Sequence, residues 1–244
     1  MFSLVIPAYN EEKRIGNTLA QLTSVLKDQQ ILVVFDGEDH TPEIVKNFPV
    51  ELIHSDKRLG KGGSIKEGIR RSKGEIVAFL DADMPVTLQS LLKVLETSLH
   101  SDLVVTVRTF MGLPTTRSFL HNSFVNTTKV FFPSLRKFRD FQGGLKAMKR
   151  DKVAPLLDEL IMNDWLFDIN LIYSFMRRGY IIEEVEVPWN HKEEGSHVSR
   201  KLVKVIVMMF LSLLKLRTFY SPARWILDTR SYKSMESVLV NILR

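Results

Sequence analysis

The sequence predicts an α/β fold, in which a mostly parallel, Rossmann-like sheet is flanked by helices. Three observations support this fold class. Short apolar runs alternate with helical periodicity through the first half, residues 76–80 are entirely apolar, and that run leads directly into Asp81 and Asp83. Uninterrupted apolar runs are typical of strands covered on both faces. Because open α/β sheets bind ligands at the carboxyl ends of strands, the two aspartates are expected at a binding site.

The first half of the chain predicts strands joined by helices. In chain order the strands are expected at residues 4–7, 31–35, 50–54, 76–80 and 103–107, and the helices at 11–27, 41–47, 62–72 and 88–99. The first helix is expected because Ile15, Leu19, Leu22 and Leu26 recur on one face. Strands that alternate with helices imply right-handed crossovers between parallel neighbours.

The second half is less regular. We expect helices at residues 119–132, 152–160 and 165–178, a half-exposed strand at 181–188, a polar loop at 191–199 and a helix at 201–217. Gly179 is the expected stop of the helix before that strand. These expectations divide the chain into a domain at residues 1–199 and an amphipathic helical segment at 200–244.

The helix expected at residues 201–217 has an unusual composition. One narrow stripe carries Met208 and four polar residues, namely Lys201, Lys204, Ser212 and Lys215, and nearly all other positions are large and apolar. This pattern fits a core helix, and it fits equally a helix lying in a membrane interface with its lysines among the headgroups.

Composition limits the class of protein. The chain has 244 residues, is 45% hydrophobic, and carries a net charge of +6, which favours an anionic partner such as a nucleotide, a nucleic acid or an anionic membrane surface. It has no cysteine, which excludes disulfides and thiolate chemistry and fits a reducing compartment. We expect no signal peptide. The longest apolar stretch, residues 205–214, is shorter than the roughly 20 residues of a membrane span, so none is expected.

The acidic pair at the end of the 76–80 strand suits a divalent cation. Hard cations take oxygen ligands, and Mg²⁺ commonly uses one or two carboxylates together with substrate phosphates. Asp81 and Asp83 therefore predict a site for a metal ion that holds a diphosphate. The alternative is that Asp83 only caps the helix that follows Met84 and Pro85.

Other strand ends carry polar groups that fit a nucleotide. Tyr9 and Glu11 follow the first strand, where the ring could cover a base or sugar and the carboxylate could accept from a ribose or base donor. The alternative is a simple turn with Asn10 as a helix cap. Asp36 ends the second strand. Polar groups at three strand ends of one sheet edge indicate a nucleotide site.

Residues 58–64 form a glycine-rich basic loop that opens a helix and includes Lys61. Free N–H groups at a helix amino terminus bind anions, so the loop is expected to contact phosphate. Its spacing fits neither a Walker A loop nor a dinucleotide fingerprint. The alternative is an ordinary loop at the start of a helix.

Several motifs together resemble family 2 glycosyltransferases of the GT-A fold. They are Val-Ile-Pro-Ala-Tyr-Asn-Glu-Glu at 5–12, the loop at 58–63, Ser-Lys-Gly-Glu at 72–75 and Asp-Ala-Asp at 81–83. Later segments are similar to elements of dolichyl-phosphate glucosyltransferases, and more distantly of dolichyl-phosphate mannose synthases. They are Asp-Phe-Gln-Gly-Gly-Leu-Lys at 140–146, Trp-Leu-Phe-Asp-Ile-Asn-Leu at 165–171, Glu-Val-Glu-Val-Pro-Trp at 184–189 and Gly-Ser at 195–196.

The resemblance implies inverting, metal-dependent transfer of a hexose, glucose or mannose, from a nucleotide sugar to a dolichyl or polyprenyl phosphate. UDP-glucose is the favoured donor, GDP-mannose stays open, and the implied cofactor is Mg²⁺ or Mn²⁺. A lipid phosphate is already an anionic nucleophile, so no strong protein base is needed. We expect a peripheral, monotopic enzyme on the cytoplasmic face of a membrane, with no nucleic-acid partner. The alternative is a family 2 transferase acting on another acceptor, such as a growing glycan.

The resemblance also assigns roles to individual residues. Those that would line the base and ribose are Pro7, Tyr9, Glu11, Val34 and Asp36, while Asp81 and Ala82 would flank the ribose and diphosphate. Asp83, with Asp81, would hold the metal. Arg108 would lie near the donor diphosphate and acceptor phosphate, and Arg117 would bind the lipid phosphate. Arginine suits both roles because its planar fork binds phosphate oxygens in pairs.

The chain departs from the family pattern at three places. A single Asp36 stands in Phe-Asp-Gly-Glu where the family has Asp-Asp-Gly-Ser, and Pro85 stands where mannose-type relatives often have glutamine. His197 replaces the lysine that usually follows Gly-Ser. A cation for the diphosphate would then come from another basic residue, namely Lys192, Arg200 or Lys201.

Overall fold

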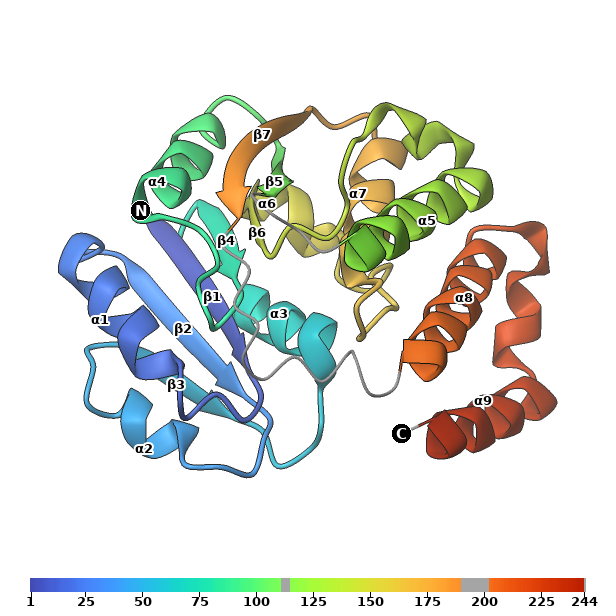
Figure 1. Cartoon of the computed structure of the whole chain (residues 1–244), viewed down its shortest axis with the longest axis horizontal. Coiled ribbons are helices and arrows are strands. Elements are labelled where there is room, and N and C mark those ends of the chain that lie inside the picture. Colours follow the sequence, from blue (N-terminus) through green and yellow to red (C-terminus); the bar gives the residue numbers. More distant parts are fainter. Residues whose placement is uncertain (111–114, 190–201, 244) are drawn as a thin grey trace. The chain divides into compact units, whose positions relative to one another are not determined.

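A computed structural model describes residues 1–110, 115–189 and 202–243, with side chains described except at 110, 115–121, 202–205 and 237–243. The chain forms two compact units (Figure 1). The first comprises Met1–Thr115 and Phe138–Lys192, and the second Thr116–Lys137 and Glu193–Arg244. The division at residues 199 and 200 that the sequence suggests stays a prediction.

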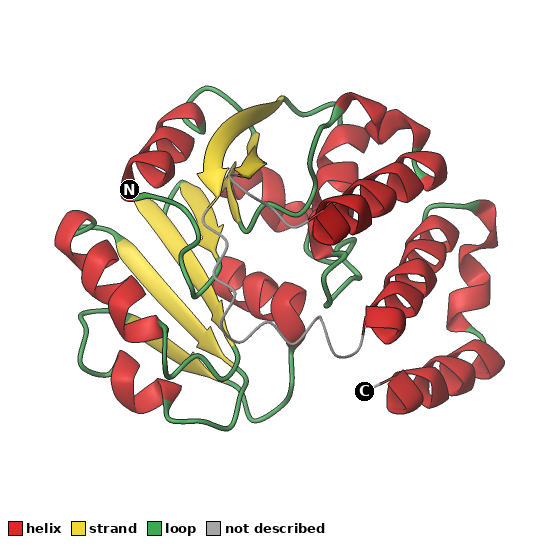
Figure 2. Cartoon of the chain, in the orientation of Figure 1, coloured by secondary structure: helices red, strands yellow, loops and turns green. Residues whose placement is uncertain are grey.

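The first unit contains one sheet of seven strands (Figure 2). In sequence order they are β1 (Phe2–Ala8), β2 (Gln30–Phe35), β3 (Glu51–His54), β4 (Ile76–Leu80), β5 (Leu103–Phe110), β6 (Leu145–Lys149) and β7 (Ile182–Trp189). Their order across the sheet is β3-β2-β1-β4-β6-β5-β7. Only β6 runs antiparallel to its neighbours, which confirms the predicted mostly parallel sheet.

Helices cover both faces of this sheet. One face, with Leu4 and Ile6 of β1, shares a core with α1 (Ile15–Val25), α2 (Thr41–Val45) and α4 (Leu88–Thr97). The other packs against α3 (Gly60–Arg71) and α7 (Phe167–Arg177). A methyl group added at Gly68 of α3 would lie 2.2 Å from Val5, and the rings of Phe79 and Phe167 are 6.1 Å apart. Alternating residues of one strand thus bury themselves on opposite faces.

Strand β6 was not predicted from the sequence. It lies between β4 and β5, and it brings the segment that follows residue 144 into the middle of the sheet. Lysines at positions 146 and 149 and the absence of β-branched residues give Leu145–Lys149 little strand propensity. Burial of Lys146 is decided by partners distant in sequence, so no local pattern could indicate it.

Three helices differ clearly from the predicted bounds, and one of them is α5 (Thr115–Phe131), which was expected to begin at residue 119. Residues 11–14 form a turn, so that α1 begins only at Ile15. The helix expected at 152–160 is replaced by α6 (Arg150–Val153) and the 3₁₀ turn η2 (Ala154–Leu156). Pro155 lacks the N–H that a continuing helix would need. Gly179 ends α7 with a φ of +71°, as predicted.

The second unit is helical. It contains α5 (Thr115–Phe131), η1 (Pro133–Lys137), α8 (Leu202–Phe219), η3 (Pro222–Asp228) and α9 (Arg230–Leu243). None of the helices, over the described residues, is both long and apolar enough to cross a membrane.

Helix α8 differs from the expected arrangement of its polar stripe. Lys215 forms an ion pair with Glu236 of α9, so this lysine faces another helix. Large apolar side chains such as Ile206 and Phe210 are exposed, while Leu213 is buried. The predicted amphipathic character, with lysines among lipid headgroups, is therefore not confirmed.

Candidate active site

The loops after β1 and β2 are joined by an asparagine. Asn10 has a φ of 55°, and its Oδ1 accepts a hydrogen bond of 2.9 Å from the backbone N–H of Glu38. A side chain at Gly37 would lie 2.4 Å from that oxygen, so the close approach requires glycine. Asn10 therefore connects two strand ends, and the alternative reading of it as a helix cap is wrong.

Asp36, at the end of β2, is 6% exposed and accepts three hydrogen bonds. They come from Arg58 Nη1 at 2.5 Å and from the N–H groups of Leu59 and Gly60, both at 2.8 Å. The guanidinium of Arg58 lies 3.4 Å above the centre of the Tyr9 ring, and Tyr9 is 45% exposed. Asp36 thus fixes a stacked Arg58–Tyr9 pair at the predicted nucleotide end of the sheet.

The N–H groups of the glycine-rich loop, which were predicted to contact phosphate, bind groups of the protein instead. The N–H groups of Leu59 and Gly60 bind Asp36, and the N–H of Gly62 donates to the carbonyl of Asn163 at 3.0 Å. A side chain at Gly62 would lie 2.5 Å from the Met162 carbonyl. The glycines let the segment before α7 pack on the start of α3, so anion binding by these N–H groups is not supported.

The acidic turn after β4 is held by backbone contacts. The N–H of Asp81 donates to the Gly144 carbonyl at 3.0 Å, and the carbonyl of Ala82 accepts from Thr18 Oγ1 at 2.7 Å. Helix α4 is capped by Thr87, whose side chain accepts from the N–H of Ser90 at 3.1 Å. The alternative in which Asp83 only caps this helix is therefore wrong.

Lys61 lies against the acidic turn. Its Nζ is 2.7 Å from Asp81 Oδ1 and 4.0 Å from Asp168 Oδ2. Burial lowers the pKa of Lys61, but attraction to Asp81 and Asp168 outweighs that effect, and the pKa is raised despite repulsion from Arg108. Lys61 is therefore a charged group at the predicted diphosphate position.

Glu11 is a largely buried carboxyl group close to the acidic turn. Burial raises its pKa to about 7; the ion pair with Arg14, at 2.7 Å, opposes that rise, while Asp83 and Asp81 add to it. The three carboxylates are thus close enough to repel one another. Two of them, Asp81 and Asp83, offer hard oxygen donors to a divalent cation that completes its coordination with phosphate oxygens.

Asp81 and Asp83 would hold that cation, since both belong to the same short turn. Within the described part of the chain, no group of three or more His, Cys, Asp or Glu side chains is placed to hold a metal by itself. Mg²⁺ commonly takes one or two carboxylates together with substrate phosphates, and the two carboxylates of this turn fit that donor set.

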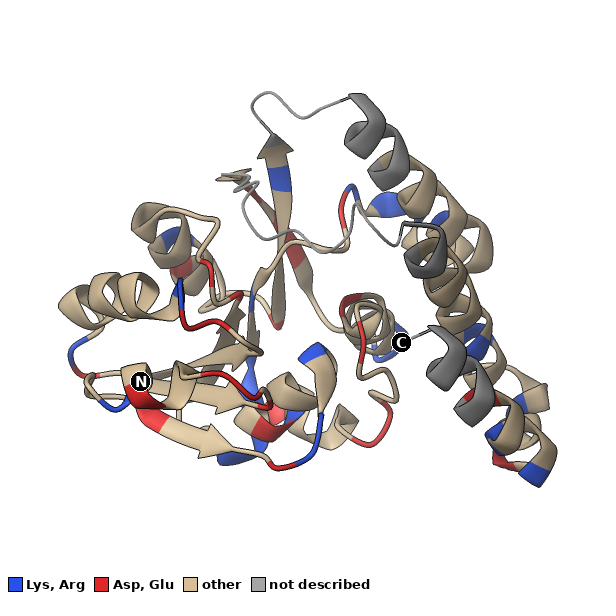
Figure 3. Ribbon diagram, turned by 60° about the horizontal axis from the view of Figure 1, so that its bottom comes forward, with Lys and Arg blue, Asp and Glu red and all other residues tan. Residues whose placement is uncertain are grey.

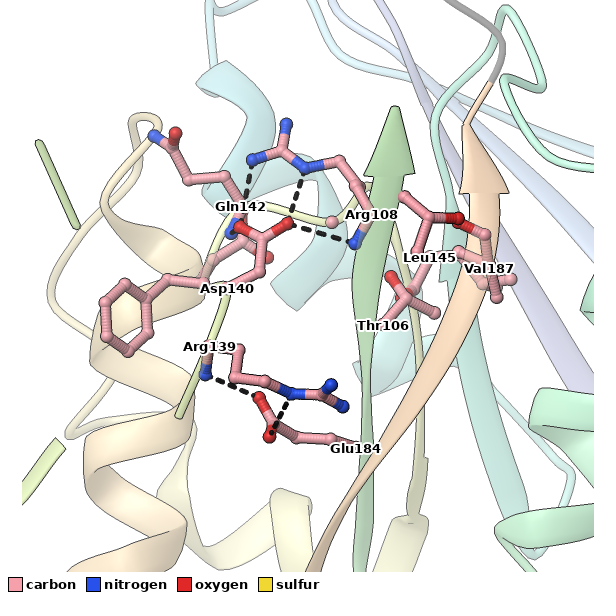
Figure 4. Close-up of polar contacts among 12 residues, drawn as sticks. Thr106, Arg108, Arg139, Asp140, Gln142, Leu145, Glu184 and Val187 are labelled. Carbon is pink, nitrogen blue, oxygen red and sulfur yellow. Dashed lines mark hydrogen bonds and ion pairs between the residues drawn. The ribbon is translucent and has the colours of Figure 1, made fainter. Parts of the chain in front are cut away.

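Arg108, on β5, is held from the side by Asp140 (Figure 4). Its Nε lies 2.6 Å from Asp140 Oδ2, and its Nη2 2.9 Å from Oδ1. Asp140 is 2% exposed and also accepts from the N–H of Gln142 at 3.1 Å. The guanidinium carbon is 5.6 Å from the Trp189 ring. A paired contact of this kind fixes both the place and the plane of the guanidinium.

Comparison with known proteins decides the family. Residues 3–157 match the model of the family described as glycosyl transferase family 2. The chain belongs to this family. Its mostly parallel sheet, flanked by helices, is the GT-A fold predicted from the motifs.

Similar proteins include enzymes named for a lipid phosphate and a solved structure of another glucosyl-transferring enzyme. One is a dolichyl-phosphate beta-glucosyltransferase of Trichomonas vaginalis, 26% identical over 94% of this chain and 77% of that protein. The dolichyl-phosphate beta-glucosyltransferase of Homo sapiens is 28% identical over 93% of this chain and 78% of its own length. A crystal structure of Mycobacterium tuberculosis glucosyl-3-phosphoglycerate synthase has a TM-score of 0.62 and 20% identity, covering 86% of this chain and 80% of that one.

The structure of this family 2 protein brings together most of the predicted first-unit residues. The side chains of Val34 and Ala82 are 0% and 4% exposed, so these two side chains offer little surface to a ligand. Pro7 lies beside Val34 in the β1–β2 ladder. Arg117 lies in α5, but its side chain is outside the description, so its role stays a prediction. His197 and the alternative cations Lys192, Arg200 and Lys201 also lie outside the described residues, so the replacement of the family lysine stays a prediction.

Sequence reasoning missed a buried ion pair in this family 2 protein. Lys146 is 0% exposed, and its Nζ lies 2.6 Å from Asp168 Oδ1. Both residues belong to motifs that the resemblance singled out, at 140–146 and 165–171, but neither was assigned a role. Their presence in those motifs was the available signal.

Proposed function

We propose that this chain is an inverting, metal-dependent hexosyltransferase that moves glucose from UDP-glucose to a dolichyl-type lipid phosphate. The observation that carries the proposal is one sheet edge with an acidic turn and two fixed cations. Lys61 contacts Asp81, and Arg108 is close enough to Lys61 to repel it. Such an edge can hold a diphosphate and an incoming phosphate together.

The names of the relatives support the choice of donor and acceptor. Proteins named dolichyl-phosphate beta-glucosyltransferase match over almost the whole chain. A fold relative was solved with Mn²⁺, UDP-glucose and phosphoglyceric acid; it has 20% identity and a TM-score of 0.61, and it covers 86% of this chain and 79% of its own. GDP-mannose is the second donor to test, because residue types do not define the base.

The residues divide the work as follows. A bound Mg²⁺ or Mn²⁺ would supply Lewis-acid stabilisation of the departing diphosphate. Lys61 neutralises further charge on that group, and Arg108 orients the lipid phosphate, whose oxygen attacks the anomeric carbon opposite the leaving group. The attacking phosphate is already ionised, so no residue needs to remove a proton from it. Attack from the opposite side inverts the configuration.

We also propose peripheral binding to the cytoplasmic face of a membrane. The second unit exposes large apolar side chains, namely Ile206, Val207, Phe210, Leu214 and Trp225. Lys and Arg residues lie along its helices (Figure 3). Exposed apolar side chains next to basic ones favour an anionic bilayer interface. Flotation with vesicles containing anionic lipid should recover the protein, and loss of flotation in Phe210→Asp would support this surface.

The deciding test is transfer by the purified full chain. Dolichyl phosphate in detergent is supplied with UDP-glucose or GDP-mannose and with Mg²⁺ or Mn²⁺, and 3-phosphoglycerate replaces the lipid in a parallel reaction. A lipid-soluble labelled product from UDP-glucose is expected. Asp83→Ala should lower kcat on the order of 10³-fold, because the metal contributes several kcal/mol. Asp28→Ala, an exposed change in the turn before β2, is the control. A product formed only with 3-phosphoglycerate or a glycan would move the acceptor assignment to that class.

A further inference from the structure

Lys146 lies at the centre of the sheet, paired with Phe79 of β4 and Val105 of β5. Its side chain is 0% exposed, and its Nζ has three acceptors. They are the carbonyls of Phe141 and Gly143, at 2.9 and 2.7 Å, and Asp168 Oδ1 at 2.6 Å. Burial lowers the pKa of Lys146 and Asp168 opposes this, while three acceptors match the three donors of an ammonium.

One arm from Lys146 leads to the acidic turn. Asp168 lies between two cations, with Oδ1 at Lys146 and Oδ2 at 4.0 Å from Lys61. Lys61 then reaches Asp81 at 2.7 Å. The four charges alternate in sign and sum to zero. Without Lys146, the buried Asp168 would keep Lys61 as its counter-charge among the described residues and would compete with Asp81 for it.

The second arm runs through the backbone. The two carbonyls bound by Lys146 belong to the turn that carries Asp140, and Asp140 holds Arg108. This turn is closely fitted. A methyl group at Gly143 would lie 2.1 Å from Thr106 Oγ1, and one at Gly144 would lie 1.8 Å from Asp81 Oδ2. A shift of the turn would therefore move the support of Arg108.

We propose that Lys146 is a positioning residue that sets both halves of the active site. Through Asp168 it leaves Lys61 available to Asp81, and through the Phe141–Gly143 turn it places Asp140 and so aims Arg108. The donor half of the site contains Lys61 and Asp81, and the acceptor half contains Arg108. This division between donor and acceptor rests on the proposed function, whereas the contacts of Lys146 with Asp168 and with the Phe141–Gly143 turn do not.

The test separates the arms with two variants. Lys146→Met removes the charge, and Lys146→Met/Asp168→Asn removes both charges of the pair, so that no unpaired charge of the pair stays buried. Lys149→Met on the same strand is the matched control, because that side chain is 34% exposed and lies near the surface. For the donor half, calorimetry measures the affinity for UDP in the presence of Mn²⁺. For the acceptor half, NMR measures the chemical shift of the Arg108 Nε–H resonance, which is assigned through its loss in Arg108→Lys.

Lys146→Met is expected to weaken UDP binding about tenfold and to shift the Arg108 resonance, at temperatures where the variant is folded. In the double variant UDP binding should return to within about threefold of wild type, while the resonance stays shifted. If Lys146→Met does not fold, the double variant alone carries the test. An unshifted resonance in either variant, unchanged UDP binding in the single variant, or failure of the double variant to restore binding would overturn the proposal. Absence of lipid product from wild type would reject the proposed function and leave the resonance test intact.

Discussion

Two buried aspartates, one directly after β2 and one in the segment before β6, each hold one arginine, but they do so differently. Asp36 contacts Arg58 through one nitrogen and uses its second oxygen for two backbone N–H groups. Asp140 contacts Arg108 through both Nε and Nη2. The side chain of Arg58 is 40% exposed, and that of Arg108 is 14% exposed.

The difference indicates different tasks. Asp36 mainly fixes the start of α3, and it leaves Arg58 stacked on the exposed ring of Tyr9. Its oxygens are already engaged, so a nucleotide would contact Arg58 and Tyr9 more readily than Asp36 itself. Asp140 instead determines the plane of Arg108, which matters for pairing with a tetrahedral phosphate. One aspartate shapes a loop and the other aims a functional group.

The largest effect in this comparison is expected for Asp140→Ala. Loss of two charge-assisted hydrogen bonds should lower kcat/KM for the lipid phosphate about 10- to 100-fold, with UDP binding nearly unchanged. Steady-state kinetics with varied lipid phosphate measures this. Asp151→Ala is the control, since that side chain is 70% exposed. In a double-mutant cycle with Arg108→Ala the effects should not add; additive effects would contradict the positioning role of Asp140.

Asp36→Ala should act on the other substrate and more weakly. It leaves the N–H groups of Leu59 and Gly60 without their acceptor, so we expect about 2 kcal/mol lower stability and about tenfold weaker UDP binding. KM for the lipid phosphate should stay within about twofold. Denaturant unfolding and calorimetry measure the two effects. Equal losses for both substrates would mean that the two aspartates do not divide the work as proposed.

Much of this site could be predicted, because local sequence patterns indicate the strands and the polar residues at their ends. Apolar runs located the parallel strands, and polar groups at their ends located Asp36, Asp81 and Glu11. Interactions over long sequence separations could not be predicted in this way. Asp140 is 32 residues from Arg108, and Asp168 is 22 residues from Lys146. A lysine in a short segment without β-branched residues predicts exposure, and only the placement of β6 between β4 and β5 buries it.

The smallest effect is expected from the pH dependence of the Asp36 side of the sheet. Burial and the nearby Asp83 and Asp81 raise the pKa of Glu11 to about 7 from 4.5, against the opposing Arg14. A raised pKa means that the folded protein binds the proton more tightly. The stabilisation is complete below pH 4.5 and is lost as the pH rises through about 7. Allowing for solvent screening, the contribution is on the order of 1 kcal/mol.

Melting temperatures of wild type and Glu11→Gln, measured without divalent cations from pH 5 to pH 8, test this shift. Wild type should lose about 2–4 °C relative to the variant across that range, because Gln cannot ionise. Asp140→Ala should keep the wild-type pH profile, since it leaves the carboxylates around Glu11 in place. Parallel profiles for wild type and Glu11→Gln would show that Glu11 keeps an ordinary pKa. Burial and the neighbouring Asp83 and Asp81 would then perturb Glu11 less than the geometry indicates.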